Sequence, residues 1–141
     1  MARAHWLVKS EPTSYGWDQF AKDGRTVWDG VRNALARRNL DSMRPGDLVL
    51  YYHSNVGKEV VGIARVVRAA YPDPKDAGGG WLAVDLEPAR PLAEPVPLVT
   101  IKADAQLAGL ALIQQPRLSV QPVSPAHFER ILTLGKTRAP R

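Results

Sequence analysis

Short apolar runs separated by turn residues are the main pattern along this chain of 141 residues. Residues 48–54 are apolar at both alternating sets of positions, which is typical of a central strand covered on both faces. Residues 81–87 alternate between apolar and polar side chains, which predicts a half-buried strand. The other runs with strand composition are residues 6–9, 60–71 and 117–121.

Glycine and proline modify two of these predicted strands. Gly62 lies inside the 60–71 run, where it predicts a bulge or a close approach of another element. Prolines at positions 88, 91, 95 and 97 should fragment the strand that starts at Trp81, because proline donates no hydrogen bond to a sheet. Prolines at this density are expected at sheet edges and crossings.

Helix signals occur between the apolar runs. The predicted helices span residues 17–22, 31–43, 102–109 and a last segment that starts at Pro125 and stops at Gly135. Asp29 is the expected cap of the second helix, and Ser124 is the expected cap of the last. Phe128, Ile131 and Leu132 should form the buried stripe of that last helix.

The order of these elements predicts an α+β fold, with a small mixed or barrel-like sheet surrounded by short helices. The length suits one hydrophobic core. We therefore expect a single domain over residues 1–135, followed by a basic and flexible tail at residues 136–141.

Composition narrows the function classes. Lys and Arg number 19 against 14 Asp and Glu, for a net charge of +5, so an anionic partner is favoured. The absence of cysteine excludes disulfides, thiolate metal sites and cysteine nucleophiles. No apolar run approaches the ~18 residues that span a bilayer, and the first residues do not resemble a signal peptide. We expect a cytoplasmic protein with no membrane partner.

The candidate motifs for catalysis and cofactor binding in this sequence are incomplete. Gly57-Lys58 lacks the glycine and hydroxyl residue that a phosphate-binding loop requires, and the three histidines have no metal-ligand spacing, so neither cofactor nor metal is expected. His53 and Ser54 are adjacent in a predicted strand, where their side chains point to opposite faces and cannot form a nucleophile and base pair. Glu11 and Asp29 could form an acid and base pair, but a cap at Asp29 and a solvated or pocket-rim position for Glu11 are the simpler interpretation. We expect a protein that is not an enzyme.

Aromatic and polar residues cluster at the ends of predicted elements. The aromatic members are Trp6, Trp17, Trp28, Tyr51, Tyr52 and Trp81, accompanied by Ser10, Asn33, His53, Ser54 and Ser119. Such side chains can stack on a planar heteroaromatic ring and hydrogen-bond to its edge. Trp28, at a predicted loop-to-helix junction, is the best pocket candidate among tryptophans that more often belong to a core.

Five sequence blocks, taken in order, resemble the signature blocks of the EVE domain family. The blocks are Trp6-Leu7-Val8-Lys9-Ser10-Glu11-Pro12, residues 27–33, residues 46–54, Tyr71-Pro72-Asp73-Pro74 and residues 117–123. The resemblance implies a PUA-like fold, related to the YTH and SRA-like readers of modified bases. It also implies non-catalytic binding of a modified nucleobase, with modified cytosine in DNA as the expected partner.

Carried onto this chain, the resemblance implies two sets of residues. The pocket candidates are Ser10, Trp28, Asn33, Tyr52, His53, Ser54 and Ser119, and the candidates for phosphate contact are Arg32, Arg37, Arg38 and Arg117. Ala34-Leu35 departs from the family pattern, in which an aromatic and a polar residue are usual, and the departure should reduce stacking at the pocket entrance.

Two other functions use the same residues. The pocket could bind a free nucleoside, nucleotide or other small molecule, and the protein would then be a sensor without a polymer partner. An enzyme acting on a base, with His53 as general acid or base, is the less favoured alternative because no nucleophile or activated water is evident in the sequence.

Overall fold

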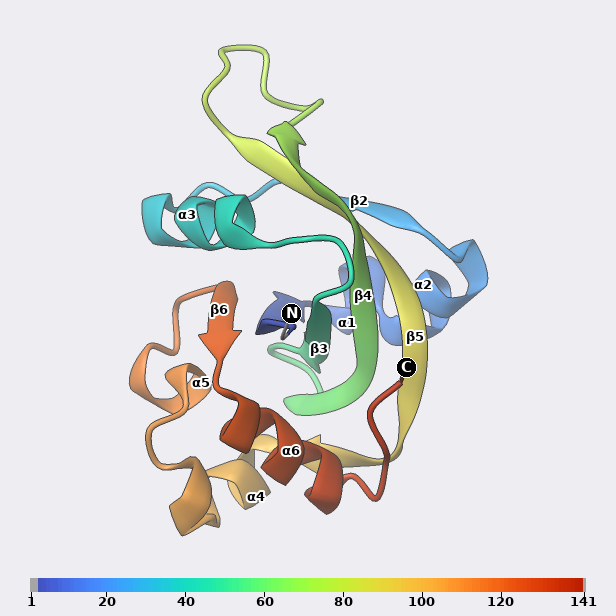
Figure 1. Ribbon diagram of the computed structural model, residues 1–141, viewed down its shortest axis with the longest axis vertical. Helices are drawn as coiled ribbons and strands as arrows, with labels where there is room; N and C mark the ends of the chain where they lie inside the picture. Colours follow the sequence, from blue (N-terminus) through green and yellow to red (C-terminus); the bar gives the residue numbers. More distant parts are fainter. Residues whose placement is uncertain (1–2, 141) are drawn as a thin grey trace.

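One curved mixed sheet organises the protein, whose computed structural model describes residues 3–140 (Figure 1). Its strands are β1 (His5–Ser10), β2 (Thr26–Trp28), β3 (Leu48–His53), β4 (Glu59–Pro72), β5 (Leu82–Pro97) and β6 (Val120–Val123). They lie in the order β2-β5-β4-β3-β1-β6. Only the β1 and β3 pair is parallel among these neighbours, and the predicted α+β class with a mixed sheet is confirmed.

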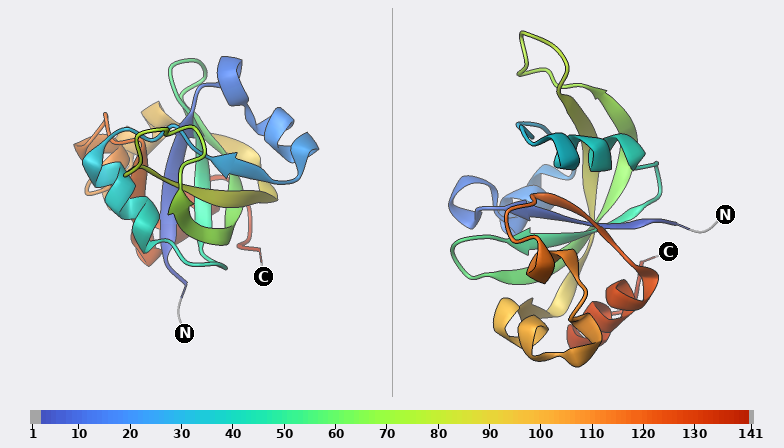
Figure 2. Two further views of the ribbon diagram at one scale, coloured as in Figure 1. Left: turned by 90° about the horizontal axis from the view of Figure 1, so that it is seen from above. Right: turned by 90° about the vertical axis from the view of Figure 1, so that its left-hand side faces the viewer.

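Short helices lie on two sides of the sheet. They are α1 (Pro12–Tyr15), α2 (Trp17–Asp23), α3 (Ala34–Ser42), α4 (Leu98–Ala103), α5 (Ala111–Gln114) and α6 (Pro125–Leu134), with a 3-10 turn at Ala105–Leu107. In the right-hand view of Figure 2, α3 lies on one side of β1 and β3, and α4 to α6 lie on the other. None of the helices within residues 3–140 is long and apolar enough to cross a membrane.

Strand alternation divides the buried residues into two cores, because successive side chains of a strand point to opposite faces. The α3-side core includes Trp6, Val8, Phe20, Leu40, Val49 and Tyr51. The α6-side core includes Leu7, Leu48, Leu50, Tyr52, Phe128 and Ile131. The covered central strand predicted at residues 48–54 is thus confirmed, and its two neighbouring tyrosines serve different cores.

The prediction that prolines fragment the strand after Trp81 is wrong. β5 is continuous for 16 residues, and β4 pairs with it through four shifts of register. β2 pairs only with residues 84–86 of β5. After residue 86, β5 has a sheet neighbour on one side only, which is β4. The prolines of this part of β5 therefore lie on an edge strand, where a missing N–H is tolerated.

Three predicted boundaries also differ from the structure. The second helix begins at Ala34 instead of Val31, and its cap is Asn33, whose Oδ1 accepts from the Ala36 N–H at 3.0 Å. Asp29 is not a cap, because residues 29–33 form neither helix nor strand and Val31 among them is buried in the α3-side core. The helix predicted over 102–109 instead starts at Leu98 and stops where Asp104 caps a 3-10 turn, and the last strand starts at Val120 instead of Arg117.

Two helices match their predicted signals. Gly24 closes α2 in the left-handed conformation, with a φ of 75°. Ser124 caps α6 by accepting from the His127 N–H at 3.2 Å, and Gly135 follows the last turn. These ends were predicted because cap residues act through the backbone of their own helix.

The C-terminal segment contacts the domain at several points. Thr137 Oγ1 accepts from the Ala93 N–H at 2.8 Å, Arg90 donates to the Arg138 carbonyl, and Arg3 donates to the carbonyl of the buried Pro140. The single-domain assignment and the flexibility of this segment stay predictions.

Candidate functional site

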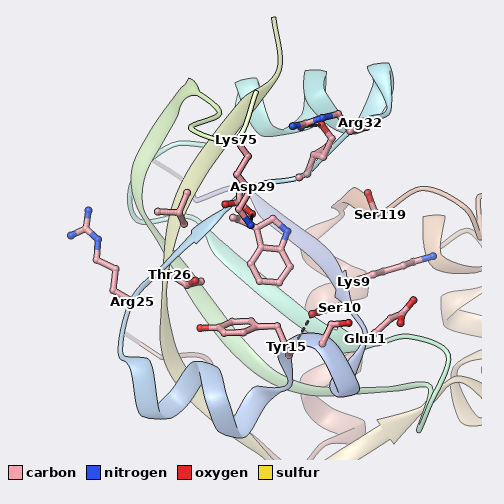
Figure 3. Close-up of a pocket in the computed structure, with 15 residues that line it drawn as sticks. Lys9, Ser10, Glu11, Tyr15, Arg25, Thr26, Asp29, Arg32, Lys75 and Ser119 are labelled. Atoms are coloured by element: carbon pink, nitrogen blue, oxygen red, sulfur yellow. Dashed lines mark hydrogen bonds and ion pairs between the residues drawn. The ribbon is translucent and has the colours of Figure 1, made fainter. Parts of the chain in front are cut away.

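A cavity of about 750 Å³ opens where β1, α1, β2 and the segment before α3 meet (Figure 3). Its lining residues are Lys9, Ser10, Glu11, Ser14, Tyr15, Arg25, Thr26, Val27, Trp28, Asp29, Gly30, Val31, Arg32, Lys75 and Ser119. Tyr15 and Thr26 lie on one side of the hollow, and Lys9, Glu11 and Ser119 lie on the other (Figure 3). The volume is within the range of small-molecule sites.

Trp28 provides a partly buried aromatic surface in this cavity. It is the last residue of β2 and pairs with Val84 of β5. Its ring meets the ring of Tyr51 edge to face, with centroids 5.6 Å apart, and Tyr51 also stacks on Phe20 at 5.2 Å. The indole is therefore supported from below by a buried aromatic cluster, which fixes its orientation.

The wall of the cavity at Tyr15 is held by the backbone carbonyl of this residue, which accepts hydrogen bonds from two hydroxyl groups. Ser10 Oγ donates to the Tyr15 carbonyl at 2.6 Å, and the Tyr51 hydroxyl donates to the same oxygen at 2.7 Å. Burial raises the pKa of Tyr51 to about 12, so its hydroxyl keeps its proton at neutral pH. Together these bonds join the ends of β1 and α1 to β3 and hold the Tyr15 side of the cavity in place.

The segment that follows Trp28 is held by a carboxylate from a distant loop. Gly30 has a φ of 76°, a conformation that favours glycine, and its N–H donates to Asp73 Oδ2 at 2.9 Å. Arg32 donates to the same oxygen at 2.8 Å, and the Lys75 N–H donates to Oδ1 at 2.7 Å. Asp73 is 3% exposed, so the loop after β4 and the cavity wall share one buried anchor.

Cations outnumber carboxylates in the cavity lining. The cationic side chains are those of Lys9, Arg25, Arg32 and Lys75, and the carboxylates are those of Glu11 and Asp29. Lys75 Nζ is 3.4 Å from Asp29 Oδ1, and Arg25 is bonded to Asp85 at 2.7 Å. Burial lowers the pKa of Lys9, whose Nζ donates to the Pro116 carbonyl at 2.5 Å. Arg32 is likewise bonded to Asp73, so carboxylates beside the cavity offset part of the positive charge of its lining.

Four of the residues expected at the site line this cavity. They are Ser10, Trp28, Ser119 and Arg32. Glu11 lies at the rim, as expected, and its Oε1 accepts from Asn55 Nδ2 at 2.6 Å. The sequence blocks around residues 6–12 and 27–33 therefore meet in space.

The other pocket candidates lie elsewhere. Tyr52 is 4% exposed in the α6-side core, on the face of β3 opposite Tyr51. His53 Nε2 accepts from the Trp17 N–H at 3.0 Å at the start of α2, and burial lowers the pKa of this imidazole, which favours the neutral form that accepts the bond. The Ser54 N–H donates to the Ser10 carbonyl, and Asn33 caps α3.

The remaining arginines, and the residues that depart from the family pattern, also lie outside the cavity. Arg37, Arg38 and Ala34 line a neighbouring groove. Arg117 and Leu35 line a third hollow. Ala34 and Leu35 do not line the cavity, so no direct contact supports the expected effect of these residues on stacking at its entrance.

Several lining residues were missed by sequence reasoning. Tyr15, Thr26, Lys9, Arg25 and Lys75 all line the cavity. Each lies in, or within three residues of, one of the blocks that carry the family resemblance, so proximity to a block was the available signal. Their direction toward the cavity depends on how the blocks pack together.

The arrangement suits binding of a flat polar molecule. An indole and a phenol ring offer surfaces for stacking, and hydroxyl groups of Ser10, Thr26 and Ser119 offer hydrogen bonds at the edge of such a ring. Within the described part of the chain, no group of three or more His, Asp or Glu side chains is placed to hold a metal ion.

The chain matches known proteins along nearly its whole length. The model of the EVE domain matches residues 4–134. The chain belongs to the EVE domain family. This EVE domain is similar to thymocyte nuclear protein 1 of Homo sapiens, with 32% identity over an alignment that covers 93% of this chain and 73% of the relative.

Solved structures agree with the assignment of this EVE domain. Rpa0253 from Rhodopseudomonas palustris is 47% identical with a TM-score of 0.90, covering 94% of this chain and 93% of that one. Human THYN1 in complex with DNA containing 5-methylcytosine is 28% identical with a TM-score of 0.85, covering 96% and 99%. The YTH domain of Zygosaccharomyces rouxii MRB1 has a TM-score of 0.62 at 15% identity over 98% of this chain and 90% of its own, a likeness of fold alone. The PUA-like fold that the resemblance implied is confirmed.

Proposed function

We propose that this EVE domain binds a modified nucleobase, modified cytosine in DNA, in the cavity of about 750 Å³ that Trp28 lines, which we call the Trp28 cavity. The observation that carries the proposal is the joint placement of Trp28, Tyr15 and Ser10 in one hollow with cationic side chains at its mouth. A base reader needs a flat apolar surface, a few hydrogen bonds at the ring edge and positive charge for the phosphates.

Human THYN1 supports the choice of DNA and of cytosine. It was crystallised with DNA that contains 5-methylcytosine, and its chain superimposes on this one with a TM-score of 0.85. A base must leave its stack to enter a cavity, which costs a few kcal/mol in a duplex. Single strands and mismatched sites should therefore bind more tightly than intact duplex.

Phosphate contacts are proposed for the arginines beside the cavity. Arg38 and Arg117 are exposed and line the neighbouring groove and the third hollow, respectively. Arg37 and Arg32 are each partly engaged, with the Gly80 carbonyl and with Asp73 respectively. We also add Lys75, which the sequence did not indicate, because its exposed side chain lines the cavity mouth.

The proposed function is binding without catalysis. His53, the general acid or base of the enzyme alternative, accepts a backbone N–H from Trp17 and does not line the cavity. Its role in the structure is to hold the start of α2. Glu11 and Asp29, the other acid and base pair considered, do line it, where they are engaged with Asn55 and Lys75. The cytoplasmic location expected for the protein stays a prediction, while the human relative carries the word nuclear in its name.

The test is fluorescence anisotropy at low salt with matched oligonucleotides, single-stranded and duplex. They carry cytosine, 5-methylcytosine, 5-hydroxymethylcytosine or N6-methyladenine at one position. The wild type should prefer one modified cytosine, and Trp28→Ala should lose about 1–3 kcal/mol of binding free energy together with the preference. Ser119→Ala should weaken binding less, because it removes one hydroxyl group at the cavity wall.

Val99→Ala, at a side chain 74% exposed on α4, is the matched control and should bind as the wild type does. Thermal unfolding of each variant verifies that the fold is retained. Equal binding of all oligonucleotides would contradict the proposal. Tight binding of free nucleosides that survives charge reversal at Arg37 and Arg38 would then identify a small-molecule sensor.

A further inference from the structure

A second hollow lies next to the Trp28 cavity, between the start of α3 and the loop that joins β4 to β5. It has a volume of about 380 Å³ and is lined by Ala34, Arg37, Arg38, Gly79, Gly80 and Trp81. We refer to it as the Trp81 groove. Its volume also lies within the range of small-ligand sites.

One side chain connects the groove to the cavity. Arg32 lines the cavity, and its guanidinium carbon is 5.7 Å from the centre of the Trp81 ring. Arg32 is held in that position by Asp73, which also fixes the cavity wall at Gly30. Two ligand groups in the two hollows would therefore lie on either side of a single guanidinium group.

The chemistry of the groove favours an aromatic anion. Two of its lining residues, Arg37 and Arg38, are cationic, and none of its lining residues carries a carboxylate. The Trp81 indole is partly exposed and offers a stacking surface. Gly79 and Gly80 have φ angles of 80° and 101°, and a Cβ built on either would meet no atom within 4 Å, so this side of the groove is open.

Hydrogen bonds hold the groove in shape before any ligand binds. Arg37 Nε donates to the Gly80 carbonyl at 2.5 Å, which joins α3 to the loop. Asp76 Oδ2 accepts from the Trp81 N–H at 3.0 Å, and the Asp73 N–H donates to the Trp81 carbonyl at the same distance. A preformed site loses less conformational entropy on binding than a flexible loop does.

We propose that the Trp81 groove binds the nucleotide next to the modified base on the same strand. Its base stacks on the Trp81 indole, and the connecting phosphate lies against Arg37 and Arg38. This inference rests on the proposed function and deepens it, because the protein then recognises a dinucleotide step in which the neighbour contributes through stacking, with little dependence on its identity.

The test uses single-stranded DNA with one 5-methylcytosine and an abasic site in place of its 5′ or its 3′ neighbour. For the wild-type protein, an abasic site on one side should weaken binding about tenfold, while one on the other side should have little effect. Trp81→Ala should weaken binding of the intact strand by a similar factor and should no longer respond to the abasic site. Trp81→Phe, which keeps a ring, should restore part of the affinity and the response.

The outcomes separate this inference from the proposed function. If neither abasic site weakens the wild type and Trp81→Ala binds normally, while Trp28→Ala abolishes binding, then the groove proposal is wrong and the base reader stands. If Trp28→Ala binds every strand as the wild type does, the reader and the groove proposal both fail. Because the abasic comparison in the wild type needs no variant, a Trp81 variant that fails to fold does not remove the test.

Discussion

Asp73 shows how much one buried side chain contributes to the candidate site. Burial alone would raise the pKa of its carboxyl group, but hydrogen bonds from Arg32, Gly30 and Lys75 outweigh burial and hold the pKa below its ordinary value. The carboxylate is therefore ionised at neutral pH and accepts from groups on both sides of the cavity mouth. At the residue scale, the geometry of the site depends on a side chain that does not line it.

Asp73→Ala tests this role through stability. The change leaves the part-buried N–H groups of Gly30 and Lys75 and the Arg32 guanidinium without their charged acceptor, and the free energy of unfolding should fall by about 1–3 kcal/mol. Urea denaturation followed by tryptophan fluorescence at neutral pH measures the loss. Because the pKa of Asp73 is lowered in the folded state, this contribution should decline as the pH falls below the ordinary carboxyl value of 3.8.

The matched control for that experiment is Asp41→Ala, at an exposed carboxylate on α3. It should change the free energy of unfolding by less than about 0.5 kcal/mol. Equal effects of the two substitutions would show that the Asp73 carboxylate does not hold the loop and the cavity wall together.

At the element scale, the contact of α2 with the sheet explains why a glycine lies in β4. A Cβ built on Gly62 would be 2.6 Å from ring atoms of Trp17, so the indole rests directly on the backbone of the strand. β4 also changes register against β5 next to this residue. The close approach and irregularity predicted for Gly62 are both confirmed. Since Trp17 packs edge to face on Tyr51, the contact extends to the aromatic cluster beneath Trp28.

Gly62→Ala should therefore destabilise the protein by overpacking. The added methyl group forces Trp17 or the strand to move, and such changes cost about 1–3 kcal/mol. A fall in the thermal unfolding midpoint, measured by calorimetry, is the expected result. Gly109→Ala is the control, because its Cβ would meet nothing closer than 3.8 Å, and its midpoint should stay near that of the wild type. An unchanged midpoint for Gly62→Ala would refute the close contact.

At the scale of the whole molecule, several cationic side chains lie around the two hollows. The chain carries a net charge of +5, and α3, the cavity mouth and the Trp81 groove together include Arg32, Arg37, Arg38 and Lys75. α4 and α6 lie on the other side of β1 and β3 (Figure 2). A polyanion would thus meet the same face of the molecule that offers the aromatic rings.

Salt dependence follows from this distribution. The logarithm of the association constant for single-stranded DNA should fall linearly with the logarithm of salt concentration, by about 0.7 for each phosphate contact. Arg38→Ala should reduce that slope by roughly one contact. Lys102→Ala removes the same charge from an exposed position on α4 and should leave the slope unchanged. Binding that is independent of salt would contradict the phosphate contacts.

The local signals of the sequence determined the position of most strands and longer helices and the overall charge, but not the short elements α1, β2 and α5. Gly24, Ser124 and Gly135 mark helix ends because caps act within a few residues of the chain, and the alternation in β1 and β3 follows from the pleat of a strand. The start of α3 and the continuity of β5 were predicted incorrectly because both depend on tertiary neighbours. Val31 is buried in the α3-side core, and the prolines of β5 lie on an edge that tolerates them.

Membership of the candidate site was decided only by the tertiary structure. The sequence placed Tyr52, His53 and Ser54 together as pocket residues. Tyr52 lies on the face of β3 opposite Tyr51, the residue that meets Trp28, and His53 contacts Tyr51 but bonds to the start of α2. Asp73 reaches Gly30 across 43 positions of sequence, a separation over which no periodic pattern carries information. A strand's alternation defines two sets of side chains, and the packing of distant segments determines which set faces the cavity.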